Sequence, residues 1–302
     1  MEIQYLTNKE INKAKWDDCI ANSNSNLVYG YSWYLDGLTK WDALIVGEYE
    51  AVLPLPFKEK WGISYLYQPF FTQQLGLFSC LDDKSISLDT VLNKVPSKFK
   101  FWDIQLNGDY KSDQFPLKPK ITMHINLNKD YDSIRSQYSK DAIKNIRKSG
   151  ALNWRIKNSA NIVRVIEDYK IAYGGLNPEI TTEHYSNLKK VIEIATEKNA
   201  AYVYELHDEN EERMASAVFL RSNKFIHYIL GAPTPLGREK NATHILIDQL
   251  LKEFSNQDLT FDFEGSEIPS VANFYKKFGV IEHTFYKLKV NKLPFPLNLF
   301  KK

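Results

Sequence analysis

Hydrophobic positions in the middle of the chain recur at steps of three and four residues, which is the spacing of one face of an α-helix. The stripe consists of Tyr131, Ile134, Tyr138, Ala142 and Ile146. Gly150 is expected to end this helix, because glycine commonly follows the last helical turn. The pattern therefore predicts one helix at the start of the second half of the chain.

After this helix, short apolar runs alternate with stretches of helical spacing. They predict, in order, a strand, two helices, three strands, a helix, a strand, a helix and a final strand. A loop rich in Pro and Gly, residues 232–240, follows the third consecutive strand. The predicted strands are 152–157, 201–206, 214–221, 224–230, 259–263 and 283–290, and the predicted helices are 161–173, 182–198, 242–254 and 270–278.

The first half reads mostly as short strands with aromatic residues and prolines. Two apolar runs, 41–46 and 51–55, flank residues 47–50 and predict a hairpin. Proline has no N–H to donate to a sheet, so Pro54 and Pro56 predict that the second strand ends there or lies at an edge. Further strands are predicted at 2–7, 62–67 and 98–104, and helices at 9–20, 32–39 and 87–95.

Composition narrows the class of protein. The 302 residues suggest two domains, and 43% hydrophobic residues suffice for packed cores. A net charge of +2 provides no global attraction to nucleic acid or anionic lipid, and two cysteines exclude a disulfide framework. The amino terminus does not resemble a signal peptide, and no run of eighteen apolar residues occurs, so a soluble cytoplasmic protein is expected. Motifs of metal sites, serine hydrolases, P-loops and Rossmann folds are missing from the sequence.

The predicted helix after residue 131 is locally basic. Residues 135–157 contain seven basic side chains and one acidic one, Asp141. One interpretation is a solvated helix face, and the other is a surface that faces an anion, such as a phosphate or an RNA backbone. The basic side chains of the helix itself are Lys140, Lys144, Arg147 and Lys148.

The predicted order of elements resembles that of the GNAT acyltransferase superfamily, and residues 237–244 (GREKNATH) strengthen this resemblance. At this place the superfamily has Arg or Gln, two residues, Gly, one residue, and then Gly or Ala, and the start of the next helix binds the donor pyrophosphate. Free amides and the positive end of the helix dipole favour an anion there. Arg238 keeps the first position, whereas Asn241 and Thr243 replace the small residues and obstruct a close approach to the backbone. The resemblance implies donor binding by these residues, and the replacements argue against ordinary CoA.

A second motif is residues 272–279 (ANFYKKFG), which looks like the penultimate helix of the superfamily. In that family the Tyr hydroxyl lies near the leaving group, so the resemblance implies that Tyr275 is a general acid. A phenol with a reference pKa of about 10 remains protonated at neutral pH and suits this role. Lys276 is expected either to meet a donor phosphate or to be solvated.

A narrower resemblance, to the Fem-type double-GNAT proteins, rests on residues 139–150 and 261–266 together with 274–279. It implies an α+β (mixed αβ) fold of two tandem GNAT-like domains, each a mixed, splayed sheet flanked by helices. The domains are expected at 1–128, truncated or degenerate, and at 129–291, with a tail at 292–302. Known members attach amino acids from aminoacyl-tRNA to peptidoglycan precursors, which adds tRNA, held by the basic helix, and a cell-envelope precursor as expected partners.

Candidate catalytic and acceptor-binding residues follow from strand and loop patterns. Asp262 and Glu264 alternate with phenylalanines, so both carboxylates are expected on one sheet face, where Glu264 could act as a general base. The alternative is a buried, hydrogen-bonded Asp262 and a Glu264 that caps the next helix. Aromatic and amide side chains in two loops of the first half can recognise a polar acceptor. These residues are Tyr31, Trp33, Gln68, Gln73 and Gln74.

The residues and the resemblance together predict an N-acyltransferase without a tightly bound cofactor. It would move an acyl or aminoacyl group from acyl-CoA or aminoacyl-tRNA to an amine acceptor bound between the two domains. The alternative is a non-catalytic ligand-binding protein on a decayed acyltransferase fold.

Overall fold

A computed structural model describes residues 1–81, 86–150, 153–265 and 267–299. The chain forms two compact units: residues 1–120 with 284–302, and residues 121–283. Two long strands, β7 (Leu117–Asn126) and β13 (Ile281–Asn291), each contribute residues to both units. Strand β13 from Thr284 onward, and the segment after it, therefore belong to the first unit.

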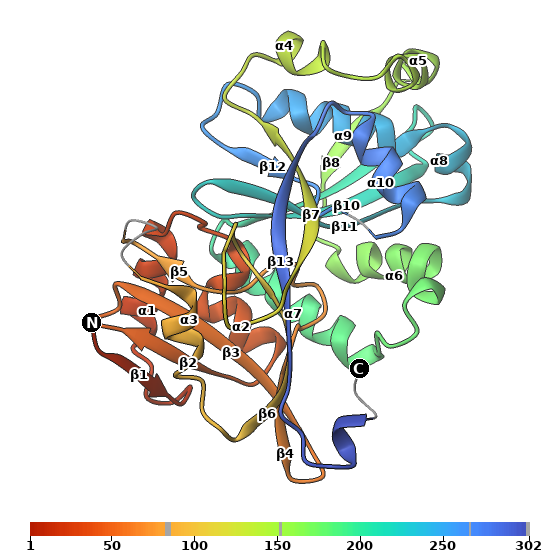
Figure 1. The fold of residues 1–302 in the computed structure, drawn as a ribbon. Coiled ribbons are helices and arrows are strands. Elements are labelled where there is room, and N and C mark those ends of the chain that lie inside the picture. The colour runs from red at the N-terminus through yellow and green to blue at the C-terminus, as the bar shows by residue number, and fades with distance from the viewer. Residues whose placement is uncertain (82–85, 151–152, 266, 300–302) are drawn as a thin grey trace. The chain divides into compact units, whose positions relative to one another are not determined.

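The first unit contains a mixed sheet with the strand order β1-β2-β3-β4-β6-β13. The pair β4–β6 is parallel, and the other pairs are antiparallel. Helix α1 packs against β3 and β5 (Figure 1). The elements are β1 (Ile3–Leu6), α1 (Lys13–Asn22), η1 (Val28–Gly30), α2 (Ser32–Leu38), β2 (Trp41–Val46), β3 (Ala51–Lys60), β4 (Ile63–Tyr67), β5 (Phe78–Ser79), α3 (Leu88–Leu92), β6 (Phe99–Leu106) and η3 (Leu297–Leu299).

The two prolines do not end strand β3, which runs on to Lys60. Residues 51–56 pair with β2 on one side. On the other side β3 pairs with β5 through residues 51–52 and with β4 through residues 57–60. Pro54 and Pro56 fall between these two partners, where the described pairings leave a local edge that needs no N–H donor. The predicted strand end was wrong, whereas the edge position was correct locally.

The second unit contains a mixed sheet with the order β7-β12-β11-β10-β9-β8. The pair β11–β12 is parallel, and the others are antiparallel. Within this unit α4, α5, α9 and α10 lie on one side of the strands in Figure 1, and α6 and α7 lie on the other. The elements are α4 (Tyr131–Arg135), α5 (Lys140–Ser149), β8 (Arg155–Asn158), α6 (Ile162–Tyr173), η2 (Gly174–Leu176), α7 (Thr182–Glu197), β9 (Ala201–His207), β10 (Arg213–Arg221), β11 (Phe225–Pro233), α8 (Pro235–Glu239), α9 (Ala242–Glu253), β12 (Thr260–Asp262) and α10 (Pro269–Lys276).

The predicted succession of strands and helices in this half is confirmed with two corrections. The helix expected after residue 131 is two helices, because Ser139 begins α5 by accepting a hydrogen bond from the amide of Ala142. The loop expected at 232–240 contains α8, which Pro235 starts at a position where proline is favoured. The first residue of the strand expected at 152–157 lies outside the described residues.

The parallel strands β11 and β12 part at one end, and this opening positions the candidate site. They pair only from Phe225 to His227 on β11, opposite Thr260 to Asp262 on β12. Strand β11 then continues to Pro233, whereas β12 ends at Asp262. A register shift against β10 leaves Ile229 as an extra residue just beyond the last pair, and such a bulge bends a strand. The second unit therefore contains the splayed sheet that the sequence resemblance implies.

Candidate active site

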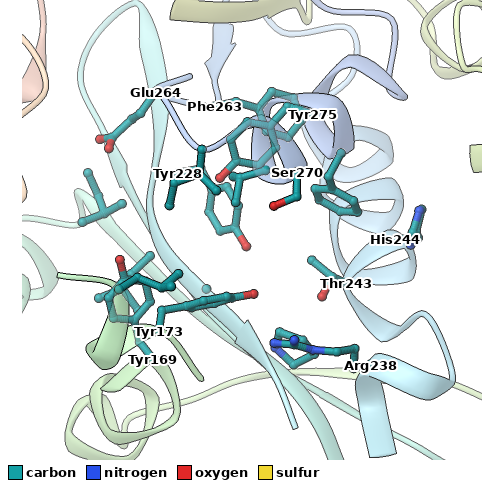
Figure 2. Close-up of a pocket in the computed structure, with 18 of the residues that line it drawn as sticks. Tyr169, Tyr173, Tyr228, Arg238, Thr243, His244, Phe263, Glu264, Ser270 and Tyr275 are labelled. Carbon is teal, nitrogen blue, oxygen red and sulfur yellow. The ribbon is translucent and has the colours of Figure 1, made fainter. Parts of the chain in front are cut away.

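A cavity of about 580 Å³ lies at this opening in the second unit. Its walls come from β11, the segment after β12, the α8–α9 region, α10 and the end of α6. Hydroxyl groups from four elements point into the same space in Figure 2: those of Tyr173 (α6), Tyr228 (β11), Thr243 (α9) and Ser270 (α10). The cavity brings together five of the predicted site residues, Arg238, Asn241, Thr243, Glu264 and Tyr275.

One wall of the cavity is suited to an anion. Arg238 lies over the ring of Tyr173, with 5.8 Å between its guanidinium carbon and the ring centre. No ion pair of Arg238 occurs within the described ranges. Asn241 and Thr243, at the start of α9, line the same wall, and the Asn241 side chain makes no capping hydrogen bond. The first amides of a helix have no partners within it and carry a partial positive charge, so this wall can hold a phosphate or carboxylate.

Asn241 preserves the backbone shape that a glycine would supply here. Its φ of +57° lies in the left-handed region. Glycine adopts this conformation without strain, and asparagine tolerates it better than most residues. The departure from the GNAT pattern at this position therefore changes the side chain while the turn into α9 is retained.

Tyr275 lies on α10 with its ring against aromatic neighbours. The ring centre is 4.7 Å from that of Phe263 and 6.2 Å from that of Tyr228. Burial, together with Tyr228 and Glu264, raises the pKa of the Tyr275 phenol well above its ordinary value. The phenol is therefore neutral at physiological pH and carries a proton that it can donate.

Glu264 follows β12 in an unusual backbone conformation, with a φ of +62°. Its amide donates a hydrogen bond of 2.8 Å to Oδ1 of Asp262. Gly265 also has a positive φ, and a Cβ there would lie 2.5 Å from the carbonyl oxygen of Ile121. This tight, left-handed turn carries Glu264 to the side of the cavity opposite Arg238 (Figure 2).

Asp262 is separated from the cavity rather than sharing it with Glu264. It is fully buried and accepts a 2.8 Å hydrogen bond from the Thr122 hydroxyl. Nδ1 of His227 lies 3.2 Å from its Oδ2, and Nε2 of His124 lies 3.5 Å from its Oδ1. Burial alone would raise the pKa of Asp262, but its contacts with both histidines outweigh that effect and hold this pKa well below its usual range. The expected pair of carboxylates on one face is therefore not formed, and the buried alternative for Asp262 is the one observed.

Lys276 lies away from the cavity. Its Nζ forms a 2.8 Å ion pair with Glu282, and both side chains are about half exposed. Lys276 is therefore on the solvated side of α10, which was one of the two positions predicted for it.

The predicted acceptor residues all belong to the first unit, and none of them is among the residues that line the cavity. Tyr31 and Trp33 stack with their ring centres 6.0 Å apart. The Gln68 side chain accepts a hydrogen bond from the backbone N–H of Gln105 and donates one to the backbone carbonyl of Thr72. The Gln74 amide donates to the side chain of Gln73. These contacts hold the loop in place, and the acceptor role stays a prediction.

Sequence reasoning missed the tyrosines of α6 as site residues. Tyr169 and Tyr173 both line the cavity, and their ring centres are 5.5 Å apart. Their spacing of four residues places them on one face of a helix, which is the only signal that the sequence contains.

His244 lines the cavity, but Figure 2 shows its ring directed away from the central space. The ring centre lies 4.9 Å from that of Phe274, and Nε2 lies 3.3 Å from the Asn145 amide nitrogen. Burial, with a smaller effect from Lys277, lowers the pKa of His244 to about 4. His244 is therefore a neutral packing residue at pH 7.

The basic helix α5 packs against α9, next to the cavity wall formed by Arg238, Asn241 and Thr243. Asn145 contacts His244 of α9, and the Ser149 hydroxyl donates a hydrogen bond to the carbonyl of Lys240, next to Asn241. The four basic side chains of α5 are exposed, and none forms an ion pair with another described residue. These residues are Lys140, Lys144, Arg147 and Lys148.

Three solved structures have folds similar to that of this chain. The structure of FemX matches with a TM-score of 0.71 over 100% of both chains, at 13% identity. A protein of unknown function from Bacteroides thetaiotaomicron has a TM-score of 0.60 and 12% identity, over 95% of this chain and 99% of the other. The C-terminal domain of a proposed lysylphosphatidylglycerol synthetase from Agrobacterium fabrum has a TM-score of 0.51 and 10% identity, over 97% and 95%.

These identities are low, so the matches establish the fold. The chain has a Fem-like GNAT fold, and the resemblance inferred from the sequence is confirmed at that level. No family model and no curated protein matches the chain. Among the described residues, no helix has the length and apolar character needed to cross a bilayer.

Proposed function

We propose that the protein is an N-acyltransferase that transfers an acyl or aminoacyl group from an activated donor to an amine. The observation that carries this proposal is the cavity at the β11–β12 opening. It joins an anion-binding wall at Arg238 and the start of α9 to a neutral phenol, Tyr275, and a carboxylate, Glu264. These are the groups that such a transfer requires.

In the proposed reaction, the amine nitrogen attacks the carbonyl carbon of the donor, and the bond from that carbon to sulfur or oxygen breaks. Glu264 or water takes the proton that the amine loses. Tyr275 gives its proton to the departing sulfur or oxygen. Positioning of donor and acceptor in one cavity supplies much of the rate enhancement, because it makes the attack effectively unimolecular.

The wall formed by Arg238, Asn241 and Thr243 suits the phosphates of two donors, acyl-CoA and aminoacyl-tRNA. An experiment must distinguish between them. The exposed basic side chains of α5 favour the polynucleotide, because they form a cationic surface beside the α8–α9 region. The side chains of Asn241 and Thr243 act against a close approach of a CoA diphosphate. Binding of a polynucleotide to α5 should weaken steeply with salt, whereas binding inside the cavity should depend less on it.

The first test combines donor screening with the variant Tyr275→Phe. Purified protein is incubated with acyl-CoAs or charged tRNA and a panel of amines, and amide products are detected by mass spectrometry. Tyr275→Phe should lower turnover about 10²-fold with little change in donor affinity, because general acid catalysis contributes on this scale. Tyr185→Phe, which removes a hydroxyl from outside the cavity lining, is the matched control. Equal turnover in wild type and Tyr275→Phe would remove Tyr275 from the mechanism.

The second candidate function is a binding protein without transfer activity. The side chains at Asn241 and Thr243 favour it, since they narrow the place where related folds bind their donor. Thermal denaturation with a panel of acyl-CoAs, charged tRNA and amines separates the two functions. A shift with amines alone, together with no product from any donor, would favour the binding protein.

A further inference from the structure

The cavity has two electrostatically different sides. Arg238 and Thr243 lie on one side in Figure 2, and Glu264 and Tyr169 lie on the other. The first side carries the charge of Arg238 and the positive end of α9. The second carries the carboxylate of Glu264. A ligand that spans the cavity would therefore be recognised best if it were anionic at one end and cationic at the other.

Four tyrosines surround the space between these sides. Tyr169 and Tyr173 come from α6, Tyr228 from β11 and Tyr275 from α10. Tyr228 reaches this place because Gly231 leaves room: a Cβ on Gly231 would lie 2.2 Å from the Tyr228 hydroxyl. The bulge at Ile229 and this glycine together direct the phenol inward.

The phenols of Tyr169, Tyr228 and Tyr275 are neutral at physiological pH, because burial raises the pKa of each. Burial, with Tyr185, Glu264 and Tyr173, raises the pKa of Tyr169 to about 12. Burial, with Tyr173 and Tyr169, raises that of Tyr228 further. Neutral phenol oxygens accept hydrogen bonds from an N–H donor, and tyrosine ring faces attract cations. The tyrosines thus add acceptors for a cation without adding negative charge.

The backbone of Glu264 is held in a costly conformation to place its carboxylate here. A glutamate with a φ of +62° is disfavoured by about 1 kcal/mol or more. The hydrogen bond from its amide to buried Asp262 and the tight turn at Gly265 hold this conformation. Strain of this kind at a cavity wall points to a ligand-binding role for the residue.

We propose that Glu264 and the tyrosines of the cavity form a recognition subsite for a primary ammonium group. The inference rests on the proposed transfer function and specifies its substrate chemistry. Two sources could supply the group: the α-ammonium of an aminoacyl donor, or the ammonium of the amine acceptor before it loses its proton. In both cases Glu264 binds the cation through a charge-assisted hydrogen bond, and the phenol oxygens complete its coordination.

Direct binding measurements test the subsite without requiring turnover. Calorimetric titrations compare glycinamide, which presents an α-ammonium, with Nα-acetyl-lysinamide, which presents a side-chain ammonium. Nα-acetyl-norleucinamide is the neutral control of similar shape. We expect at least one ammonium probe to bind ten-fold or more tightly than the neutral control. Tighter glycinamide binding assigns the subsite to the donor, and tighter lysinamide binding assigns it to the acceptor.

Matched variants connect this binding to the named residues. Glu264→Gln should weaken the ammonium probe at least ten-fold, and Tyr169→Phe should weaken it a few-fold. Glu267→Gln is the control, because this exposed acid lies three residues away and does not line the cavity. Glu264→Asn provides a second charge-free variant whose side chain tolerates a positive φ.

The outcomes separate the subsite from the transfer function. Equal binding of ammonium and neutral probes, or unchanged binding in folded Glu264→Gln and Glu264→Asn, would overturn the subsite even if transfer is observed. Ammonium binding that depends on Glu264, without product from any donor, would support the subsite and count against the transferase.

Discussion

The backbone amide of Glu264 donates a 2.8 Å hydrogen bond to Oδ1 of Asp262, two residues earlier in the chain. Asp262 is fully buried and does not line the cavity, whereas Glu264 lines the cavity wall. The buried carboxylate of Asp262 therefore fixes the turn that carries Glu264 to the cavity wall. Of these two carboxylates, that of Glu264 is the one that lines the cavity.

Replacement of Asp262 by alanine should destabilise the second unit by about 3 kcal/mol. The variant leaves the Thr122 hydroxyl and the Glu264 amide without their acceptor, and unsatisfied buried donors are costly. Urea unfolding measures the change. Asp258→Ala, an exposed acid just before β12, should change the free energy of unfolding by less than about 0.5 kcal/mol. Similar values for the two variants would show that the buried network contributes little.

The same carboxylate predicts a pH dependence. The pKa of Asp262 is lowered in the folded state, so its stabilising contribution is present above the unfolded value of about 3.9 and is lost as the pH falls further. The stability difference between wild type and Asp262→Ala should therefore be present at pH 5 and shrink below about pH 4. Unfolding curves at pH 5, 4 and 3 test this, and a difference as large at pH 3 as at pH 5 would contradict it.

The lowered pKa of His244 predicts that the free energy of unfolding also depends on pH in a second, higher range. Burial first, and Lys277 second, lower its folded pKa to about 4, below the ordinary value of about 6.5. Between these values the unfolded chain takes up a proton that the folded chain does not, so stability should fall as the pH drops from 6.5 to 4. The slope is at most about 1.4 kcal/mol per pH unit. In His244→Gln this part of the slope should disappear, and an identical slope in both proteins would exclude His244 as its source.

Sequence patterns predicted those parts of the fold that depend on local spacing. The order of elements in the second half follows from hydrophobic periodicity. The family resemblance of two short motifs pointed to Arg238 and Tyr275, and both line the cavity. The break at Ser139 was missed because the apolar stripe continues across it, while the capping hydrogen bond to the Ala142 amide starts a new helix. A local capping interaction thus outweighed a longer periodicity.

The missed parts of the site depend on contacts between distant segments. Tyr169 belongs to α6, far along the chain from Glu264 and Tyr275, and the packing of α6 against β11 brings its side chain to the same cavity. Strand alternation placed Asp262 and Glu264 on one face, but the positive φ of Glu264 breaks the alternation at that residue. Such a conformation has no signature in the residue types alone.

Gly237 should be intolerant of substitution for a packing reason. A Cβ at this position would lie 1.8 Å from the carbonyl oxygen of Met214 on β10, which backbone atoms cannot accommodate without moving α8. Gly237→Ala should destabilise the protein by about 3 kcal/mol. Gly175→Ala, where a Cβ would meet no atom within 4 Å, should change stability by less than about 1 kcal/mol. Thermal unfolding of both variants tests this, and equal melting temperatures would contradict the close packing of α8 on β10.

A substitution at Asn241 tests whether this side chain only obstructs the binding of a CoA diphosphate or contacts a different donor. Asn241→Gly keeps the left-handed turn at a φ of +57° and removes the side chain, so the fold should change in stability by less than about 1 kcal/mol. If the side chain only obstructs a diphosphate, this variant should bind acetyl-CoA several-fold more tightly than wild type in calorimetric titrations. Asn241→Ala is the control: it also shortens the side chain, but it should lose about 1 kcal/mol of stability, because alanine is disfavoured at a positive φ. Unchanged or weaker acetyl-CoA binding by Asn241→Gly, with the fold intact, would contradict obstruction and favour an asparagine that contacts a donor other than CoA.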